Sequence, residues 1–289
     1  MSEGKFASIN IHLTDECNYS CCFCFSSGKG CSSEPQIGLE DWKPILYDLI
    51  KNRGVTKINF AGGEPLKHPD LIGCIRYAKE LGATTSIITN SSLLNKEFFR
   101  KVYGYLDWIG FSIDSVDDYT EVILGRHCKG CRHLEHVKLM SDLAHDYEVK
   151  VKLNIVVNRF CLDDDFSEFI RRLDPQRVKF LQVSRVSGMN DTSYGKISIT
   201  AKSFEEFKTK HRGVVLSNGV RPVFESESDI LESYLMLDPS GQLRISTPKG
   251  YEFVPYEIYW ANPGRFNVDY EKYVKRGGIY DWASTTERD

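Results

Sequence analysis

Several features of common protein classes are missing from this sequence. No apolar run is long enough to span a bilayer, and the start, Met1-Ser2-Glu3-Gly4-Lys5, has no apolar signal core. The formal net charge of −3 provides no basic field of the kind that attracts nucleic acid. Internal repeats and low-complexity linkers are also missing. We therefore expect a cytoplasmic protein that binds neither membranes nor nucleic acid directly.

The cysteines are unusual in number and in spacing. Nine cysteines, an odd number, suit a reducing compartment better than a disulfide framework. Cys17, Cys21 and Cys24 have the spacing C-x3-C-x2-C, just after the apolar stretch 8–13. Three thiolates in one tight loop can hold a [4Fe–4S] cluster and leave one iron open to a small molecule. The alternative, a zinc site, would need a second ligand pair at the usual spacing, and no convincing pair follows.

Strand-like apolar runs alternate with amphipathic helical stretches, which is typical of βα units and a parallel sheet. The six expected strands lie near residues 8–13, 56–61, 84–89, 107–113, 149–156 and 177–183. Six strands are too few for a closed eight-stranded barrel, so the expected fold is α/β, an open partial (β/α)6 barrel over residues 1–185. Residues 186–289 include a helical stretch around 203–207. We expect them to pack on the open side as a C-terminal extension within one structural unit.

Basic residues recur on one face of the expected strands, because residues two apart share a face. This basic set consists of Lys57, Lys150, Lys152, Arg177 and Lys179. If the apolar faces pack against helices, the set points into the barrel, where an unpaired cation costs several kcal/mol. A triphosphate inside the barrel would compensate these charges. The alternative is that the lysines lie at strand ends and extend their ammonium groups into solvent.

These patterns resemble the radical S-adenosylmethionine (radical SAM) enzymes. The cysteine spacing is the signature of that superfamily, and Gly62-Gly63-Glu64-Pro65, after the strand near 56–61, is similar to its GGEP element. The resemblance implies that the open iron binds the amino and carboxylate groups of S-adenosylmethionine. It also implies that Gly62, Gly63 and Glu64 belong to the cofactor site, and that the barrel is partial.

Within that superfamily the chain resembles viperin and its microbial relatives, from about residue 7 to Trp282. The resemblance is carried by segments 17–25, 57–65, 153–160 and 275–278. It implies dehydration of CTP, or else UTP, to the 3′-deoxy-3′,4′-didehydronucleotide, a chain-terminating antiviral product. The 5′-deoxyadenosyl radical would take the 4′ hydrogen. An electron donor of the flavodoxin or ferredoxin type would be needed, and we expect a monomer.

The resemblance also implies roles for individual residues. Five of them match triphosphate-binding positions: Asn10, Lys57, Lys152, Arg177 and Lys179. Ser112 and Arg126 match positions that hold the methionine carboxylate, and Asn90 matches a position that binds the ribose of S-adenosylmethionine. Tyr234 corresponds to a tyrosine near the substrate ribose, so Tyr234 and Lys152 are the catalytic candidates. Alternatively, Ser112 and Asn90 only form turns at the ends of their strands. Tyr234 could likewise be an ordinary aromatic residue in a short strand.

The resemblance to viperin does not account for two segments of the chain. After Ser246 the chain has an aromatic run to Trp260 where viperin is rich in glycine and lysine, which leaves the preferred base open. Cys128 and Cys131, flanked by histidines, could hold zinc or an auxiliary cluster, but four ligands within seven residues fit poorly with zinc spacing. We expect reduced thiols in a loop there.

Other functions compatible with the cysteine motif make different predictions. A radical SAM enzyme that acts on a peptide or another phosphorylated substrate predicts further cysteines in the C-terminal part, and none follows Cys161. A non-catalytic iron–sulfur sensor would bind a cluster without cleaving S-adenosylmethionine. A nucleotide-binding barrel with an ordinary metal site leaves the order of the cysteine motif and GGEP unexplained.

Overall fold

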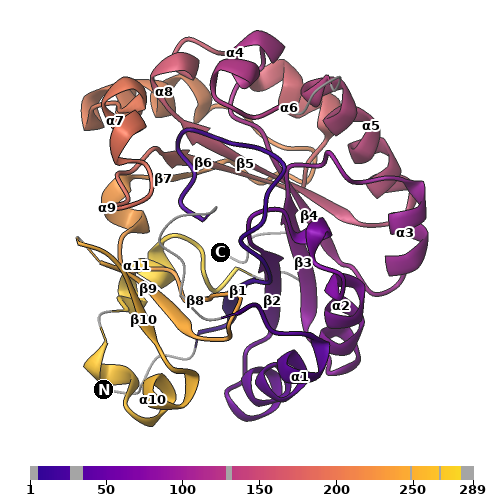
Figure 1. Ribbon diagram of the computed structural model, residues 1–289. Coiled ribbons are helices and arrows are strands. Elements are labelled where there is room, and N and C mark those ends of the chain that lie inside the picture. Colours follow the sequence, from indigo (N-terminus) through magenta and orange to yellow (C-terminus); the bar gives the residue numbers. More distant parts are fainter. Residues whose placement is uncertain (1–5, 27–34, 128–131, 248, 267, 281–289) are drawn as a thin grey trace.

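The structure, a computed structural model, describes residues 6–26, 35–127, 132–247, 249–266 and 268–280. Among these residues, ten strands form one sheet in the order β10-β9-β8-β1-β2-β3-β4-β5-β6-β7. Figure 1 shows this sheet as an open curve with helices along its outer side. The strands are β1 (Ser8–His12), β2 (Lys57–Ala61), β3 (Thr84–Thr89), β4 (Trp108–Ser112), β5 (Lys150–Val157), β6 (Arg177–Gln182), β7 (Val223–Glu225), β8 (Met236–Leu237), β9 (Leu243–Thr247) and β10 (Gly250–Val254).

Helices connect most of the strands. The α-helices are α1 (Leu39–Tyr47), α2 (Leu71–Glu80), α3 (Lys96–Val102), α4 (Asp118–Ile123), α5 (His133–Asp146), α6 (Ser167–Leu173), α7 (Asp191–Ile197), α8 (Ala201–His211), α9 (Glu227–Ile230), α10 (Tyr256–Ala261) and α11 (Tyr270–Lys275). A π-helical turn, η1 (Asp48–Asn52), follows α1. The short 3-10 helices are η2 (Pro65–Lys67), η3 (Arg159–Cys161) and η4 (Pro263–Arg265).

The six strands expected from the sequence are β1 to β6, and their bounds agree with the expected ones within one residue. They are neighbours in chain order and run parallel throughout. The helices between them cover the outer side of the curve (Figure 1). The expected open partial barrel is therefore confirmed.

The C-terminal segment extends both edges of this barrel. β7 pairs in parallel with β6, and β8 pairs in parallel with β1. β9 and β10 then continue the sheet beyond β8 in antiparallel fashion. The sequence analysis placed this segment on the open side of the barrel but did not predict its strands. An edge strand presents unpaired backbone groups that favour further pairing, and β7 and β8 are too short to show a detectable alternation.

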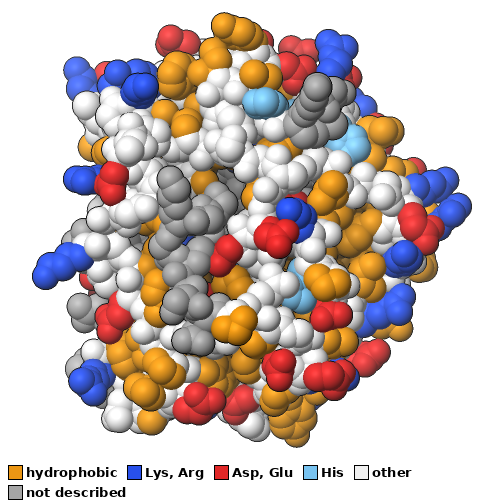
Figure 2. All heavy atoms as spheres, in the orientation of Figure 1, with side chains coloured by type: hydrophobic (Ala, Val, Ile, Leu, Met, Phe, Trp, Pro, Cys, Tyr) orange, Lys and Arg blue, Asp and Glu red, His pale blue; other side chains and the backbone are white. Residues whose placement is uncertain are grey.

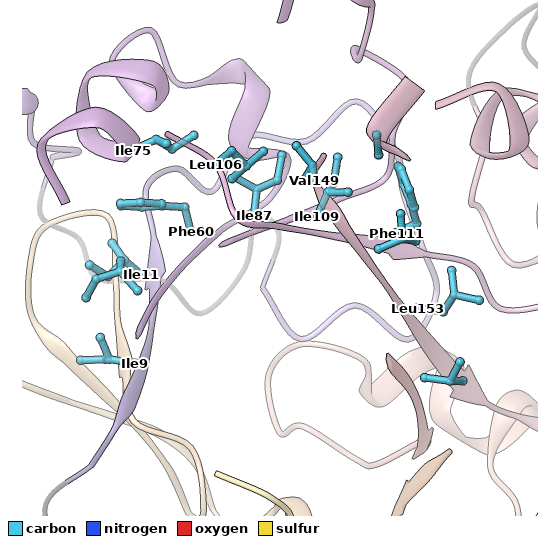
Figure 3. Packing of buried hydrophobic residues seen from close by; sticks show 14 of the residues in the cluster. Ile9, Ile11, Phe60, Ile75, Ile87, Leu106, Ile109, Phe111, Val149 and Leu153 are labelled. Atoms are coloured by element: carbon cyan, nitrogen blue, oxygen red, sulfur yellow. The ribbon is translucent and has the colours of Figure 1, made fainter. Parts of the chain in front are cut away.

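The main core lies between the sheet and the outer helices. Ile9, Ile11 and Phe60 are at most 1% exposed, and Figure 3 shows them on neighbouring strands with Ile87 and Ile109 further along the sheet. Each fully buried side chain of this size contributes about 1.5–3 kcal/mol. Because side chains alternate along a strand, this packing turns the intervening polar residues to the inside of the curve.

Candidate active site

A cavity of about 290 Å³ lies inside the curve of the sheet. Residues that follow the carboxyl ends of strands line one end of it, among them Cys17, Gly62 and Asn90. Lys57 and Lys152, near the amino ends of β2 and β5, line the other end. At about 3.3 Å per residue, Lys57 and Gly62 are separated by about 16 Å along β2. The cavity therefore has two chemically different ends.

The thiol end is formed by the loop after β1. Cys17, Cys21 and Cys24 all line the cavity. The backbone N–H groups of Tyr19 and Ser26 donate to the sulfurs of Cys17 and Cys24, both at 3.4 Å. Burial raises the pKa of the Cys17 and Cys21 thiols, so their thiolate forms need a bound cation. Three thiols that line the same end of the cavity, two of them with N–H donors, suit the protein side of a three-thiolate iron–sulfur site.

Glycines allow two other loops to lie directly against the cysteine loop. A Cβ atom on Gly63 would lie under 3.0 Å from the carbonyl oxygen of Glu16, and one on Gly125 would crowd that of Ser20 in the same way. A Cβ atom on Gly62, whose φ is +143°, would likewise lie under 3.0 Å from the carbonyl oxygen of Thr14. The double glycine of the GGEP segment is thus required by close backbone approach.

Glu64 and Asn90 join the ends of β2 and β3. The Glu64 carboxylate accepts hydrogen bonds from the Thr89 hydroxyl at 2.7 Å and from the Asn90 N–H at 2.8 Å. Burial raises the pKa of Glu64 to about 7. The Asn90 amide donates to Cys17 Sγ at 3.7 Å. Of the expected cofactor residues in this region, Gly62 and Asn90 line the cavity with Gly63, whereas Glu64 lies behind them.

Ser112 and Arg126 also line the thiol end, and two carboxylates hold Arg126. Its Nε donates to Asp114, and the Glu121 carboxylate lies 3.7 Å away. Glu121 in turn accepts the Asp114 N–H at 2.7 Å. Although burial opposes the charge, these carboxylates raise the pKa of Arg126 above its ordinary value. Sequence reasoning missed Asp114 and Glu121, although both follow closely after the strand predicted near residues 107–113.

The basic end contains most of the expected triphosphate residues. Lys57, Lys152 and Lys179 line the cavity and are 3%, 8% and 4% exposed. Asn10 lines it too, and its side chain accepts a hydrogen bond of 2.8 Å from Asn59. Burial lowers the pKa of Lys57 and Lys152 well below the ordinary lysine value, and the neighbouring cations add to the effect. A buried group of mutually repelling cations is suited to bind a polyanion.

Arg177 has a different position from the lysines. It is 1% exposed, and its guanidinium lies 4.0 Å from the centre of the Tyr280 ring. The pairing of β5 with β6 places it directly beside Lys152. Arg177 is therefore next to the basic end, but it is not among the described residues that line the cavity.

Tyr234 lines the cavity within a polar network that the sequence did not reveal. Its hydroxyl donates to Glu225 at 2.6 Å, and Glu225 also accepts a hydrogen bond from Lys179. The Arg276 guanidinium lies 3.5 Å from the centre of the Tyr234 ring. Glu225 was missed because β7 was not predicted. Arg276 belongs to segment 275–278, which carried the resemblance without a role for this residue.

Two expectations concern regions outside the cavity. Cys128 and Cys131 lie outside the described residues. No helix of the described part of the chain is long and apolar enough to cross a membrane. On the face in Figure 2, basic and acidic side chains are mixed around the margin. The lysines of the basic end are buried and do not belong to a charged surface patch.

Comparisons with known proteins connect this geometry to a family. The family model for the Radical SAM superfamily matches residues 11–173. An S-adenosylmethionine-dependent nucleotide dehydratase of Thermoplasmatales archaeon (strain ISO4-H5) is 38% identical, over 97% of this chain and 98% of its own. A protein of the same name from Flammeovirga pacifica is 31% identical over 95% of this chain and 96% of its own. S-adenosylmethionine-dependent nucleotide dehydratase RSAD2 of Oncorhynchus mykiss is 31% identical over 98% and 82%.

Solved structures are similar in fold at much lower identity. The structure of anSMEcpe with bound AdoMet has a TM-score of 0.65 and 14% identity, and the match covers 93% of this chain and 82% of that one. Streptococcus suis SuiB bound to S-adenosylmethionine has a TM-score of 0.62 and 18% identity, over 95% and 68%. These matches agree with the partial barrel described above.

Proposed function

Because the chain belongs to the radical SAM superfamily and, within it, to the viperin-like nucleotide dehydratases, we propose that it dehydrates a pyrimidine ribonucleoside triphosphate, CTP or else UTP. The product is the 3′-deoxy-3′,4′-didehydronucleotide, a chain terminator for viral RNA synthesis. Enzymes of this superfamily use a [4Fe–4S] cluster and S-adenosylmethionine, which together supply a 5′-deoxyadenosyl radical.

The observation that carries this proposal is the cavity with its two ends. The thiols of Cys17, Cys21 and Cys24 suit the cluster, and Lys57 and Lys152 lie at the opposite end. A substrate that spans such a cavity carries its anionic part away from the radical and its reacting carbon toward it. A ribonucleoside triphosphate has this arrangement.

The residues of the chain bind and orient the two reactants. Gly62, Gly63, Asn90, Ser112 and Arg126 hold S-adenosylmethionine at the thiol end, supported by Glu64 behind them. At the basic end the triphosphate is bound by Asn10, Lys57, Lys152, Arg177 and Lys179. Ammonium and guanidinium groups donate several charge-assisted hydrogen bonds to phosphate oxygens. A fixed triphosphate places C4′, rather than another ribose carbon, next to the radical.

The proposed reaction needs electrons and a proton besides the two reactants. Nucleotide, S-adenosylmethionine, two electrons and one proton give the didehydronucleotide, water, methionine and 5′-deoxyadenosine. The proton leaves with the 3′ hydroxyl as water, so the site must control protons near the ribose, where we place Lys152 as a proton donor and Tyr234 as a hydrogen-bond partner of the ribose. We further propose an electron donor of the flavodoxin or ferredoxin type. Because the cluster thiols must stay reduced, we place the protein in the cytoplasm. We propose that it acts as a monomer.

Anaerobic turnover tests the proposal directly. The cluster-loaded, reduced protein is incubated with S-adenosylmethionine and with CTP, UTP, ATP or GTP in separate reactions. Mass spectrometry then follows 5′-deoxyadenosine and any nucleotide lighter by one water. We expect dehydration of one pyrimidine nucleotide, and the result also identifies the base.

Two other outcomes would contradict the proposal in different ways. Cleavage of S-adenosylmethionine without a dehydrated nucleotide would indicate a peptide or another phosphorylated compound as substrate. An intact cluster without any cleavage would indicate a sensor.

A further inference from the structure

Glu225 is a carboxylate buried in a site rich in cations. It ends β7, and the pairing of β7 with β6 places Val223 directly opposite Lys179. Glu225 is 0% exposed, accepts a hydrogen bond from the Lys179 ammonium and accepts another, of 2.6 Å, from the Tyr234 hydroxyl. A negative charge next to a phosphate site weakens anion binding by repulsion. The buried Glu225 carboxylate must therefore have a role other than direct binding of phosphate.

The groups that act on Glu225 come from several elements, and most are basic. They are Lys152 on β5, Lys179 on β6, Tyr234 before β8 and Arg276 after α11, and Arg177 on β6 acts on Lys179 and Tyr234. Burial raises the pKa of Glu225, but Lys179 and Arg276 outweigh burial and keep this pKa below its ordinary value. The carboxylate is thus ionised at neutral pH and only accepts hydrogen bonds.

The ionised Glu225 carboxylate determines which hydrogen bonds the Tyr234 hydroxyl can form with a substrate. The single hydroxyl proton of Tyr234 is donated to Glu225, so the oxygen has only lone pairs left for other partners. Such an oxygen accepts a hydrogen bond from a ribose hydroxyl and does not donate one. The Arg276 guanidinium stacks on the ring at 3.5 Å and donates to the Ser233 carbonyl at 2.7 Å, which fixes the ring from the other side.

Glu225 also acts on the charge of Lys179. Burial lowers the pKa of Lys179 to about 8, and the Glu225 carboxylate opposes this change. One of the three ammonium protons is donated to Glu225, which leaves two for phosphate oxygens. Without the carboxylate, the ammonium would lose its proton at a lower pH.

We propose that Glu225 is a positioning residue of the nucleotide site, which fixes the Tyr234 hydroxyl as an acceptor for the ribose and keeps Lys179 charged for the triphosphate. The inference rests on the proposed function, because it assumes a nucleotide in this cavity. Glu225 acts through its two partners and does not line the cavity among the described residues.

The test compares Glu225→Gln with Glu206→Gln, which removes the same charge from the exposed face of α8. Nucleotide affinity is measured against pH on the cluster-loaded protein without reductant, so that no turnover occurs. With reductant, the ratio of 5′-deoxyadenosine to dehydrated nucleotide is measured. In Glu225→Gln we expect affinity to fall at a pH about one unit or more lower than in the unmodified protein. We also expect the ratio to rise, because the ribose is held less firmly.

Two further variants separate the two partners of Glu225. Tyr234→Phe removes only the hydroxyl, so the ratio should rise while the pH dependence of affinity stays unchanged. Lys179→Arg stays charged at every pH used, so the part of the fall in affinity that Lys179 causes should disappear, and only the part due to Lys57 and Lys152 should remain. These two variants decide the matter if circular dichroism and iron content show that Glu225→Gln does not fold.

The outcomes distinguish this inference from the proposed function. If the unmodified protein dehydrates a nucleotide and Glu225→Gln behaves like Glu206→Gln in both measurements, the inference alone is overturned. An unchanged ratio in Tyr234→Phe, or a fall in affinity above pH 8 that is as large in Lys179→Arg as in the unmodified protein, would overturn it as well. If the unmodified protein dehydrates no nucleotide, the proposed function fails first.

Discussion

Lys179 loses its proton within a pH range that binding measurements can cover. Its pKa of about 8 in the nucleotide-free protein results from burial, which the Glu225 carboxylate partly opposes. A bound triphosphate adds negative charge and raises this pKa again. Nucleotide binding above pH 8 is therefore accompanied by proton uptake.

We predict that nucleotide affinity decreases above pH 8, as Lys179 loses its proton. Titration calorimetry of the cluster-loaded protein at several pH values measures this dependence. The contribution of Lys179 to the stability of the nucleotide-free protein should change in the opposite direction. Between pH 8 and the ordinary lysine value of 10.5, Lys179 binds its proton in the unfolded state and not in the folded one, so its contribution to the free energy of unfolding rises with pH. An affinity that rises above pH 8 would contradict the assignment of Lys179.

Cys21 and Cys22 are adjacent but differ in their surroundings. Both pack against the small cluster that contains Phe23 and Leu124, but only Cys21 lines the cavity with the other two thiols of the motif. We predict that Cys21→Ala loses the brown absorbance and the bound iron, because the cluster loses one of three thiolates. Cys22→Ala should keep both, and iron analysis after anaerobic reconstitution distinguishes the two variants. A retained cluster in Cys21→Ala would contradict the ligand assignment.

At the level of elements, the cysteine loop depends on neighbouring loops for its position. The Ser20 and Cys22 N–H groups donate to the carbonyls of Gly125 and Leu124 at 3.1 and 2.9 Å. From the other side, the Glu64 N–H donates to the Glu16 carbonyl at 2.8 Å. The cluster site is therefore built by the ends of three βα units and not by the motif alone.

Gly125 offers a test of this dependence with a matched control. Gly125 and Gly104 have similar φ angles, +79° and +75°. A Cβ on Gly125 would lie under 3.0 Å from Ser20, whereas one on Gly104 meets nothing within 4 Å. Both alanine variants carry the backbone penalty of about 1–2 kcal/mol. Only Gly125→Ala should also lose bound iron, as measured by iron content after reconstitution. Equal iron content in the two variants would contradict the role of this contact.

At the level of the whole molecule, the C-terminal segment closes both edges of the barrel sheet. β7 covers β6 and β8 covers β1, on the two sides of the opening in Figure 1. Tyr273 of α11 is 0% exposed, accepts the Ser8 N–H at 2.9 Å and donates to the Gly278 carbonyl at 2.6 Å. These contacts support our proposal that residues 1–185 and 186–289 form one structural unit.

We predict that a chain of residues 1–185 aggregates, because both edges of its sheet are left unpaired. The full chain should unfold in a single cooperative transition when the denaturation curves from circular dichroism and tryptophan fluorescence are compared. A monodisperse, folded 1–185 fragment, or two separate transitions in the full chain, would contradict this view.

Local patterns in the sequence were sufficient for the barrel strands and for the cysteine motif. β1 to β6 show a clear alternation over five or more residues, and this alternation also predicted that Lys57, Lys152 and Lys179 face inward. The cysteine motif is local as well, since its three thiols belong to one loop. These features depend on residues close together in the chain, so the period of a strand or a loop spacing is enough to predict them.

The edge strands and the polar networks depended on long-range pairing. Glu225 meets Lys179 and Tyr234 only because β7 adds to the far edge of the sheet, and its three residues carry no detectable period. The two carboxylates on Arg126 likewise come from different elements. Which charges are neighbours in a buried site follows from strand register and packing between distant segments, and no local pattern in the sequence encodes it.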